Sequence, residues 1–374
     1  MKKGWEYKKL GEVTTFMSGY TPKKEEIKSF GTFPYFKVAE MNLIGNEKYM
    51  TNTPFFISSP LKIFPKGSII FPKNGGAVYT EKKRILKVDS VIDLNTEAIC
   101  SGKELYNYYL YYFLSSIKIS SFDKGGGLPS LDMKKMAETM IGYPPFEEQR
   151  SIVDNLDSAF AKIDAMKANA EKALNEAKAL FQASLKEMLE PKEGWEEKKF
   201  GEVCWYNKNN GLHKGTKYVG MEHIEQGTGK LLGTISSDDV LSNTFAFSKG
   251  DVLYGRLRPY LKKVIVADFD GCCSTEIFPI QSKNILASFL MYWFLTDEIT
   301  NKVNATCAGC RMPRGNMNDV LKFDISYPSI SEQHSIVTTL DSLKSKVDRL
   351  QENYEKISQE CDALKQAILR QVFE

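Results

Sequence analysis

The sequence predicts an α+β protein in which two mixed α/β domains are joined by two long helices that pair as an intramolecular antiparallel coiled coil. Three observations lead to this prediction. The chain repeats its own flanking segments, two proline-poor segments carry a seven-residue apolar repeat, and the sequence between the repeats differs between the halves. We expect the first domain at 1–145, a first spacer helix at 146–193, the second domain at 194–327 and a second spacer helix at 328–374.

Each expected domain begins and ends with a repeated segment. The opening repeat reads Gly-Trp-Glu-Tyr-Lys-Lys-Leu-Gly-Glu-Val at 4–13 and Gly-Trp-Glu-Glu-Lys-Lys-Phe-Gly-Glu-Val at 194–203, with eight of ten positions identical. The closing repeat aligns 143–190 with 327–374 without a gap. A chain that keeps its flanks twice while its inserts diverge is suited to presenting two different surfaces in one fixed geometry.

Two aromatic runs lie inside the domains, at 108–114 and 289–295, and align at an offset of 181. Each is far shorter than the roughly 20 apolar residues of a membrane-spanning helix, so we expect two equivalent buried helices and no membrane role. Seven cysteines, an odd number, without a secretory leader favour a reducing, cytoplasmic setting.

The two spacer segments are predicted to be helices of about 40 residues, near 60 Å at 1.5 Å per residue. After the proline-marked turns, no proline or glycine occurs until Pro191 in the first segment, and none occurs in the second. In the second, apolar residues fall on two heptad rows: Ile336, Leu343, Leu350, Ile357, Leu364, and Leu340, Val347, Tyr354, Cys361, Ile368. The same positions in the first are Ile152, Ala159, Met166, Ala173, Leu180, and Leu156, Ile163, Ala170, Ala177, Ser184. Small residues opposite bulky ones favour pairing within the chain, although each helix could also find a different partner.

Positive charge belongs to the expected domains and not to the spacers. The net charge is +7 over 1–145 and +1 over 194–327, against −3 over 146–193 and −2 over 328–374. This distribution favours a polyanion that contacts the domains, although an ordinary solvated surface would also explain it.

The arrangement resembles the specificity subunit of type I restriction-modification enzymes, in which two variable recognition domains alternate with two similar helical regions. The opening repeat is similar to the start of each recognition domain. The closing repeat, with Tyr-Pro-Pro-Phe-Glu-Glu-Gln at 143–149 and Tyr-Pro-Ser-Ile-Ser-Glu-Gln at 327–333, resembles the turn that leads into each spacer helix. Segments 217–224 and 250–261 resemble further family motifs, with looser counterparts at 34–38 and 66–72.

The resemblance implies a non-catalytic subunit that binds double-stranded DNA at a bipartite asymmetric site, one half-site per domain. It also implies methyltransferase subunits, two in number, as partners, and restriction subunits joined through the assembled complex. That complex would carry adenine-specific methylation and ATP-dependent cleavage, whereas this chain would need no cofactor of its own. A coiled-coil scaffold that displays two protein-binding domains is the alternative.

Candidate DNA-binding residues in the second domain centre on a basic cluster. Arginine can donate to O6 and N7 of guanine, lysine mostly neutralises phosphate, and asparagine can pair with adenine. A solvated hairpin or a plain turn would explain the same residues. The candidates are Arg256, Arg258, Tyr260, Lys262 and Lys263, with Lys208, Asn209, Lys214, Arg311 and Arg314.

The first domain is richer in lysine than in arginine, which favours holding the DNA backbone over reading guanine. Glycines near its basic residues would let the main chain approach phosphate, although ordinary turns in loops would explain these glycines as well. Its candidates are Lys73, Asn74, Lys82, Lys83, Arg84 and Lys124.

Several catalytic and metal-binding motifs are missing or incomplete. Tyr143 stands where amino-methyltransferases carry an asparagine or aspartate before Pro-Pro-aromatic, and no Gly-x4-Gly-Lys-Ser/Thr loop is present. The pair Cys307 and Cys310, with Cys272 and Cys273, has zinc-ligand spacing, but the aligned positions in the first half carry no ligands. We therefore expect neither a catalytic residue nor a metal site.

Overall fold

The structure is a computed structural model that describes residues 2–207, 209–307 and 311–374. The chain divides into two compact units. Unit 1 comprises residues 1–169 and 356–374, and unit 2 comprises residues 170–355. Within the described ranges, no helix is long and apolar enough to cross a membrane.

Unit 1 contains strands that alternate with short helical turns, followed by the first long helix. Its strands are β1 (Glu6–Lys9), β2 (Thr14–Ser18), β3 (Phe33–Phe36), β4 (Tyr49–Met50), β5 (Phe56–Ile57), β6 (Ile69–Pro72), β7 (Arg84–Leu86), β8 (Val91–Ile92), β9 (Thr96–Ser101) and β10 (Met140–Tyr143). Its α-helices are α1 (Leu10–Val13), α2 (Asn107–Ser116), α3 (Met133–Ala137) and the start of α4 (Phe146–Leu189). Its 3-10 turns are η1 (Lys24–Glu26), η2 (Val38–Asn42), η3 (Gly76–Thr80) and η4 (Ile119–Phe122).

Unit 2 repeats this plan with a different insert. Its strands are β11 (Glu196–Lys199), β12 (Cys204–Tyr206), β13 (Asn210–Gly211), β14 (Lys217–Val219), β15 (Ile235–Ser236), β16 (Thr244–Phe247), β17 (Val252–Gly255), β18 (Val264–Val266), β19 (Gly271–Ser274), β20 (Ile277–Ser282) and β21 (Asp324–Tyr327). Its α-helices are α5 (Phe200–Val203), α6 (Ala287–Leu295), α7 (Asp297–Ala305), α8 (Met317–Val320) and the start of α9 (Ile330–Phe373). Its 3-10 turns are η5 (Met221–His223), η6 (Ser237–Asp239) and η7 (Pro259–Leu261).

The central sheets of the two units have the same strand order. Unit 1 has β2-β9-β6-β7 with β4 added at the edge, and unit 2 has β12-β20-β17-β18. The second sheets differ, because unit 1 has a three-stranded β5-β3-β8 sheet and unit 2 a five-stranded β13-β16-β19-β14-β15 sheet. The prediction of two mixed α/β domains with long helices is confirmed. The sequence between the repeats, which differs between the halves, forms second sheets that also differ.

The opening and closing repeats pair with each other. In unit 1, β1 and β10 are antiparallel with Glu6 opposite Tyr143, and in unit 2, β11 and β21 place Glu196 opposite Tyr327. In each pair the tyrosine hydroxyl donates to the glutamate carboxylate, at 3.1 Å and 3.2 Å. The repeated flanks therefore form a two-stranded ribbon that closes each domain.

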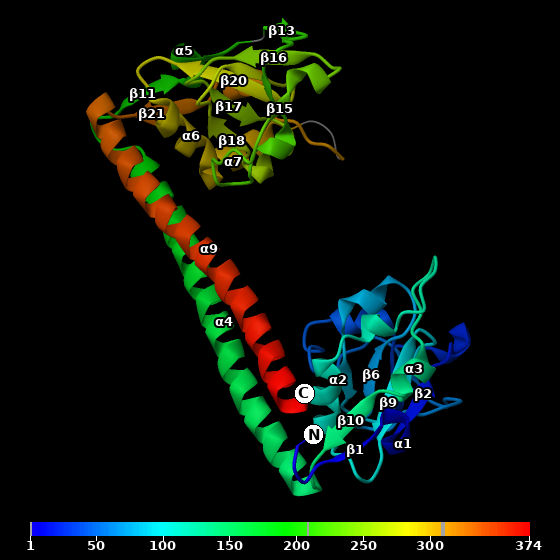
Figure 1. Ribbon diagram of the computed structural model, residues 1–374. Helices are drawn as coiled ribbons and strands as arrows, with labels where there is room; N and C mark the ends of the chain where they lie inside the picture. Colours follow the sequence, from blue (N-terminus) through cyan, green and yellow to red (C-terminus); the bar gives the residue numbers. More distant parts are fainter. Residues whose placement is uncertain (1, 208, 308–310) are drawn as a thin grey trace. The chain divides into compact units, whose positions relative to one another are not determined.

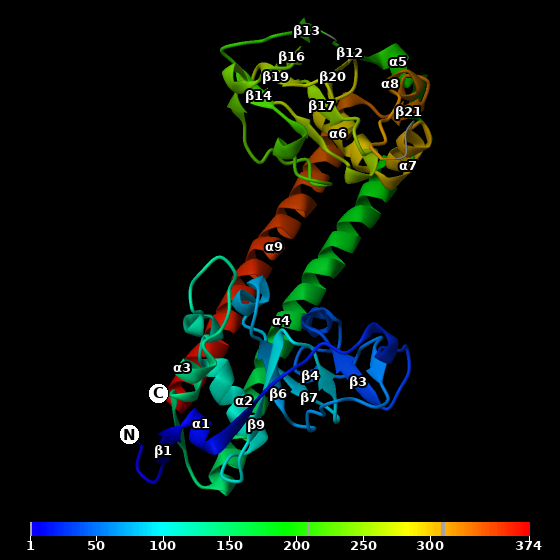
Figure 2. The same ribbon diagram turned by 90° about the vertical axis from the view of Figure 1, so that its right-hand side faces the viewer.

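The aromatic runs form α2 and α6, which are buried as expected. Figures 1 and 2 show α2 beside β6 and β9, and α6 beside β17. The predicted offset of 181 is wrong by one residue, however. Tyr106 is the N-cap residue of α2 and Leu286 that of α6. The backbone amide of Tyr106 donates to the side chain of Gln149, and that of Leu286 donates to the side chain of Gln333, both at 2.8 Å. The offset of 180 makes these helix starts equivalent.

Each glutamine is fully buried at the start of a long helix. Gln149 also donates to the carbonyls of Glu104 and Pro144, at 2.8 Å and 2.9 Å. Gln333 donates to those of Asn284 and Pro328, both at 2.9 Å. One amide side chain thus fixes the closing turn, the spacer helix and the aromatic helix together in each unit, which explains why the Glu-Gln pair recurs in the sequence.

Each domain core is completed by the start of one long helix and the end of the other. In unit 1 the ring of Phe373 contacts Tyr109 and Phe113, with ring centroids 5.2 Å and 5.8 Å apart. In unit 2 Phe181 and Leu185 of α4 join the core around Tyr292. Figure 2 shows α4 and α9 as uninterrupted helices.

The long helices touch in an antiparallel sense within unit 1. Asp164 pairs with Lys365, and Lys167 pairs with Asp362 at 3.5 Å. In unit 2, Lys178 donates to Gln351 at 2.8 Å. Pairing as a coiled coil along the whole helices stays a prediction.

One of the two heptad rows predicted for the first helix is wrong. Met166 and Leu180 were expected to be part of an inner row, yet each is 60% exposed. The row one residue later is the inner one, with Val153, Leu174 and Phe181 buried. The apolar rows of the two helices are therefore not in the same phase, because a shift of one residue turns a row by about 100° around the helix axis.

Candidate nucleic-acid interface

Two segments of unit 2 that are far apart in the sequence form one basic corner. We define the unit 2 corner as residues 256–263, between β17 and β18, together with residues 311–315, before α8. The amide of Arg258 donates to Pro313 at 2.7 Å, and that of Gly315 donates to Arg256 at 2.9 Å. The structure thus brings together the two arginine clusters that the sequence predicted separately.

A carboxylate that the sequence did not single out lies between these arginines. Glu276 accepts from Nε of Arg256 at 3.0 Å and from Nε of Arg314 at 2.8 Å, through different oxygens. It is positioned by the register of the central sheet, since the amide of Arg256 donates to its carbonyl at 2.9 Å. The guanidinium of Arg256 also lies over the ring of Phe278, 5.3 Å from the centroid.

The turn η7 projects between two residues with left-handed backbone. Arg258 before it has φ +52° and Lys262 after it has φ +47°, a conformation that is uncommon outside glycine. Lys262 donates to the carbonyl of Leu295 at 3.0 Å and pairs with Asp297. Such strained backbone persists only where surrounding contacts hold it, and it clusters at functional loops.

The other candidates of unit 2 differ in how far they are engaged. The Lys263 ammonium donates to the carbonyl of Met221, and that of Lys214 donates to three carbonyls of residues 237–240. Asn209 and Arg311 are exposed, as is Tyr260. Lys208 lies outside the described residues.

Unit 1 has an equivalent corner with different side chains. We define it as residues 73–83 with residues 124–131. The amide of Gly75 donates to Pro129 at 2.8 Å, and that of Leu131 donates to Lys73 at 2.9 Å, which matches the backbone bonds of unit 2. Lys73 pairs with the buried carboxylate of Glu97 at 3.0 Å.

Two more candidates of unit 1 lie at this corner. The side chain of Asn74 accepts from the hydroxyl of Ser130 at 3.0 Å. Lys124 is exposed, and its amide donates to the carbonyl of Ser130 at 2.9 Å. Asn74 and Lys124 therefore lie on the two segments that meet at the corner.

The basic run 82–84 is largely committed to internal contacts. Lys83 is only 7% exposed, pairs with Glu81 at 3.1 Å, and burial lowers its pKa. Burial also lowers the pKa of Arg84, which donates to the carbonyls of Lys83 and Met41. Lys82 donates to the side chain of Asn42. A basic triplet in the sequence thus contributes less surface charge than its composition suggests.

Sequence reasoning singled out Tyr260 but missed Tyr79, Leu128 and Met312 at the corners. Tyr79 occupies in η3 the position that Tyr260 occupies in η7, the last residue but one of the turn, and both are exposed. Leu128 and Met312 precede equivalent prolines and are also exposed. Their recurrence could have been found by aligning the halves at offsets of 181 and 184, but the surrounding inserts show little similarity.

Comparisons with known proteins agree on one family. The family model described as "Type I restriction modification DNA specificity domain" matches residues 2–176 and again 192–359. The chain is 25% identical over 410 residues to the EcoDI specificity subunit of Escherichia coli, covering 99% of this chain and 88% of that protein. It is 24% identical over 392 residues to the MjaVIII specificity subunit of Methanocaldococcus jannaschii, with 94% and 89% covered.

The chain belongs to the type I restriction modification DNA specificity domain family. Solved structures share its fold. A chain from work on complex assembly and conformational transition of the type I R-M system has a TM-score of 0.76 at 19% identity, covering 99% of this chain and 97% of that one. The HsdS subunit from Thermoanaerobacter tengcongensis has a TM-score of 0.59 at 19% identity, covering 100% and 97%. The resemblance drawn from the sequence is confirmed.

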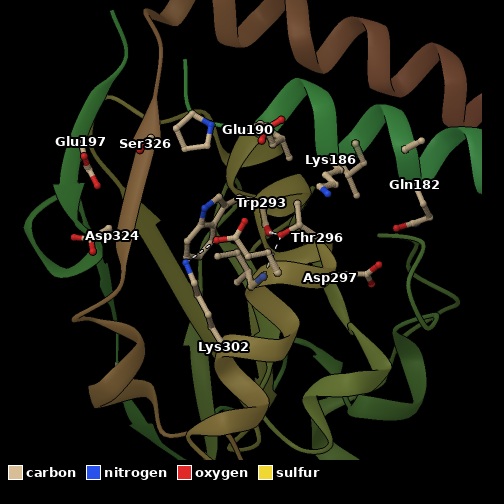
Figure 3. Close-up of a pocket in the computed structure, with 16 residues that line it drawn as sticks. Gln182, Lys186, Glu190, Glu197, Trp293, Thr296, Asp297, Lys302, Asp324 and Ser326 are labelled. Atoms are coloured by element: carbon tan, nitrogen blue, oxygen red, sulfur yellow. Dashed lines mark hydrogen bonds and ion pairs between the residues drawn. The ribbon is translucent and has the colours of Figure 1, made fainter. Parts of the chain in front are cut away.

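A cavity of about 720 Å³ lies elsewhere in unit 2 of this specificity subunit. Figure 3 shows Gln182 and Lys186 from α4 and Glu190 just after its end on one side, with Glu197 and Asp324 from β11 and β21 on another. Its carboxylates outnumber its ammonium groups. The full set of charged lining residues is Lys186, Glu190, Glu197, Asp297, Glu298, Lys302 and Asp324. Such a surface repels phosphate, so this cavity is not suited to DNA.

The cysteines of unit 2 do not form a ligand cluster among the described residues. Cys272 and Cys273 are buried neighbours on β19. No group of three or more histidine, cysteine or acidic side chains in the described ranges could hold a metal ion. Cys310, the fourth cysteine with zinc-ligand spacing, lies outside those ranges.

Proposed function

We propose that this specificity subunit is a non-catalytic DNA reader that recognises a bipartite asymmetric site, with one half-site bound by each basic corner. The recurrence of the corner carries the proposal. Both corners have the same backbone bonds, Gly75 to Pro129 in one and Arg258 to Pro313 in the other, but different side chains around them. Recognition of two different half-sites requires the same backbone arrangement with different side chains on it.

The exposed groups at the corners fit the chemistry of DNA. Phosphate contacts by lysine and arginine supply most of the affinity, and hydrogen bonds to base edges in the major groove supply the sequence preference. Arg256 and Arg314 suit guanine in the second half-site, whereas Asn74 suits adenine in the first. The exposed tyrosines and apolar tips offer contacts to sugars and thymine methyl groups.

The long helices are proposed to set the unread gap and to dock partner subunits. The support for this proposal is that each long helix contributes residues to the core of both units, Val153 and Leu156 of α4 in unit 1 and Phe181 and Leu185 of α4 in unit 2. We propose two methyltransferase subunits as direct partners and restriction subunits joined through the complex. In that complex the partners supply adenine-specific methylation and ATP-dependent cleavage.

Salt dependence of DNA binding tests the proposal. Affinity of the complex with its methyltransferase subunits should fall steeply between about 50 and 200 mM salt, because bound phosphates release counterions. Affinity that stays flat over this range would refute DNA reading and favour a scaffold with two protein-binding domains.

The variant Arg256→Gln tests whether the unit 2 corner recognises the DNA sequence. Loss of a bidentate contact should weaken binding to the mapped site by about 1–3 kcal/mol, roughly 5- to 150-fold. The change should relax preference in the second half-site and leave the first unaffected. Lys302→Gln, on the exposed face of α7, is the matched control. Equal losses from both variants would place the reading surface elsewhere.

A further inference from the structure

We propose that Glu276 is a positioning residue that holds Arg256 in the orientation in which it selects guanine in the second half-site. The inference rests on the proposed function, because it assumes that the unit 2 corner reads DNA. Glu276 is 21% exposed and lies between two arginines from separate segments. No sequence motif marked it, and its place is set by the register of β17 and β20.

Two contacts restrain the guanidinium of Arg256, and a third fixes its backbone. Its Nε donates to one oxygen of Glu276 at 3.0 Å, its own amide donates to the carbonyl of Glu276 at 2.9 Å, and Phe278 lies against the group. Among the described residues, the hydrogen bond of this side chain uses Nε alone. The terminal pair of N–H groups, the edge that matches O6 and N7 of guanine, is left for a ligand.

Arg314 holds the carboxylate in turn. Its Nε donates to the other oxygen of Glu276 at 2.8 Å, and its Nη1 donates to the carbonyl of Met312 at 3.3 Å. With one oxygen engaged by Arg314, the other is directed to Arg256. A long side chain held in this way loses less conformational entropy when it binds, which raises selectivity at one base pair.

The charges of Arg256, Glu276 and Arg314 predict in which direction the DNA affinity changes when Glu276 is replaced. Glu276 offsets one of two positive charges, so its replacement by glutamine raises the net charge at the corner by one. The released arginine can then pair with any phosphate, which strengthens binding to arbitrary DNA and steepens its salt dependence by about one phosphate contact. A positioning residue therefore lowers selectivity while raising general affinity, whereas a purely structural residue would lower affinity for every DNA.

The experiment compares the complex carrying Glu276→Gln with the unmodified complex. The site is first mapped from methylated bases in cells that contain this subunit and its methyltransferase. Affinity is then measured for the mapped duplex, for duplexes with single changes in each half-site, and for a random duplex. We expect preference for guanine in the second half-site to fall about 5- to 150-fold, with preferences in the first half-site unchanged.

Two further variants make the test specific. Glu298→Gln makes the same change in a carboxylate that pairs with Lys302 at 2.6 Å on α7, and should leave all preferences unchanged. In the double variant Arg256→Gln with Glu276→Gln, the second change should add no further loss of selectivity, because Glu276 acts through Arg256. Losses that multiply would overturn the proposal, as would a mapped second half-site without guanine.

The remaining outcomes separate this inference from the proposed function. If the unmodified complex reads a bipartite site but Glu276→Gln keeps its selectivity, only the role of Glu276 is wrong. If Glu276→Gln lowers the unfolding temperature and weakens binding to every duplex alike, the residue is structural and the inference is also wrong. If the unmodified complex binds DNA without salt dependence or sequence preference, the proposed function itself fails.

Discussion

Replacement of Gln333 by leucine tests how the spacer helices are attached to their domains. The side chain is fully buried and makes three hydrogen bonds, accepting from the amide of Leu286 at 2.8 Å and donating to two carbonyls at 2.9 Å. Leucine has similar volume but none of this capacity, so one N–H and two C=O groups would be left buried without partners.

The expected loss follows from those three groups. A buried polar group without a partner costs about 1–3 kcal/mol, so the three together cost about 3–9 kcal/mol. Burial of the leucine side chain returns about 1.5–3 kcal/mol. The middle of each range leaves a loss of about 4 kcal/mol in the unfolding free energy of unit 2, which lowers its unfolding temperature by roughly 8–16 °C for a unit of this size.

Urea denaturation followed by tryptophan fluorescence measures this loss, since Trp195 and Trp293 belong to the core of unit 2. Hydrogen exchange at the amide of Leu286 reports the local effect, because that amide loses its acceptor. Gln359→Leu, at an exposed position of α9, is the control and should change stability by no more than about 0.5 kcal/mol. A cost for Gln333→Leu below about 1 kcal/mol would refute the view that this glutamine ties the junction together.

Three further predictions address the modules, the spacing and the core. Exchange of residues 14–142 for the domain of another family member should change one half-site only, as read from methylated bases, and changes in both would contradict modular reading. A seven-residue insertion in either spacer helix should lengthen the unread gap; an unchanged gap would show that the helices do not set it. Burial raises the pKa of Cys204 to about 12, above the value near 8.5 of an unfolded thiol. The stability that the protonated thiol of Cys204 contributes is therefore complete below about pH 8.5 and is lost as pH rises toward 12. Cys204→Ala should make the unfolding free energy fall less steeply with pH in the alkaline range. An unchanged dependence of unfolding free energy on pH would count against this assignment.

Local and periodic features could be predicted from the sequence. The two long helices follow from apolar spacing and the lack of internal proline, and α2 and α6 follow from their aromatic runs. The phase of the first helix could not be copied from the second. Its inner row contains Phe160, against which Lys365 of α9 packs with its ammonium 5.4 Å from the ring centroid. A bulky apolar residue is thus matched by a long polar one, which an apolar heptad pattern does not show.

The candidate site was predicted in its parts but not in its assembly. The clusters at 256–263 and 311–314 were recognised from composition, but only backbone bonds between distant segments place Arg256 and Arg314 on either side of one carboxylate. Burial was equally hidden. Lys83, directly before β7, stands in a basic triplet, yet it is buried in unit 1, where its ammonium pairs with Glu81 and donates to the carbonyl of Ile117. Tertiary contacts decide which charges of a basic run reach solvent.

The two corners indicate how one frame can accommodate different half-sites. Backbone pairing makes Lys73 equivalent to Arg256, and residues 95 and 97 of unit 1 equivalent to 276 and 278 of unit 2. In unit 1 the carboxylate that pairs with the basic residue stands at 97, and in unit 2 it stands at 276, two positions away on the same face of the sheet. The basic side chain is therefore held from a different direction in each corner, while the strands and flanking ribbons keep the same connections. If the corners read DNA as proposed, a change of this kind would alter which base edge is reached without disturbing Gln149 or Gln333, the residues that hold the domains to their helices.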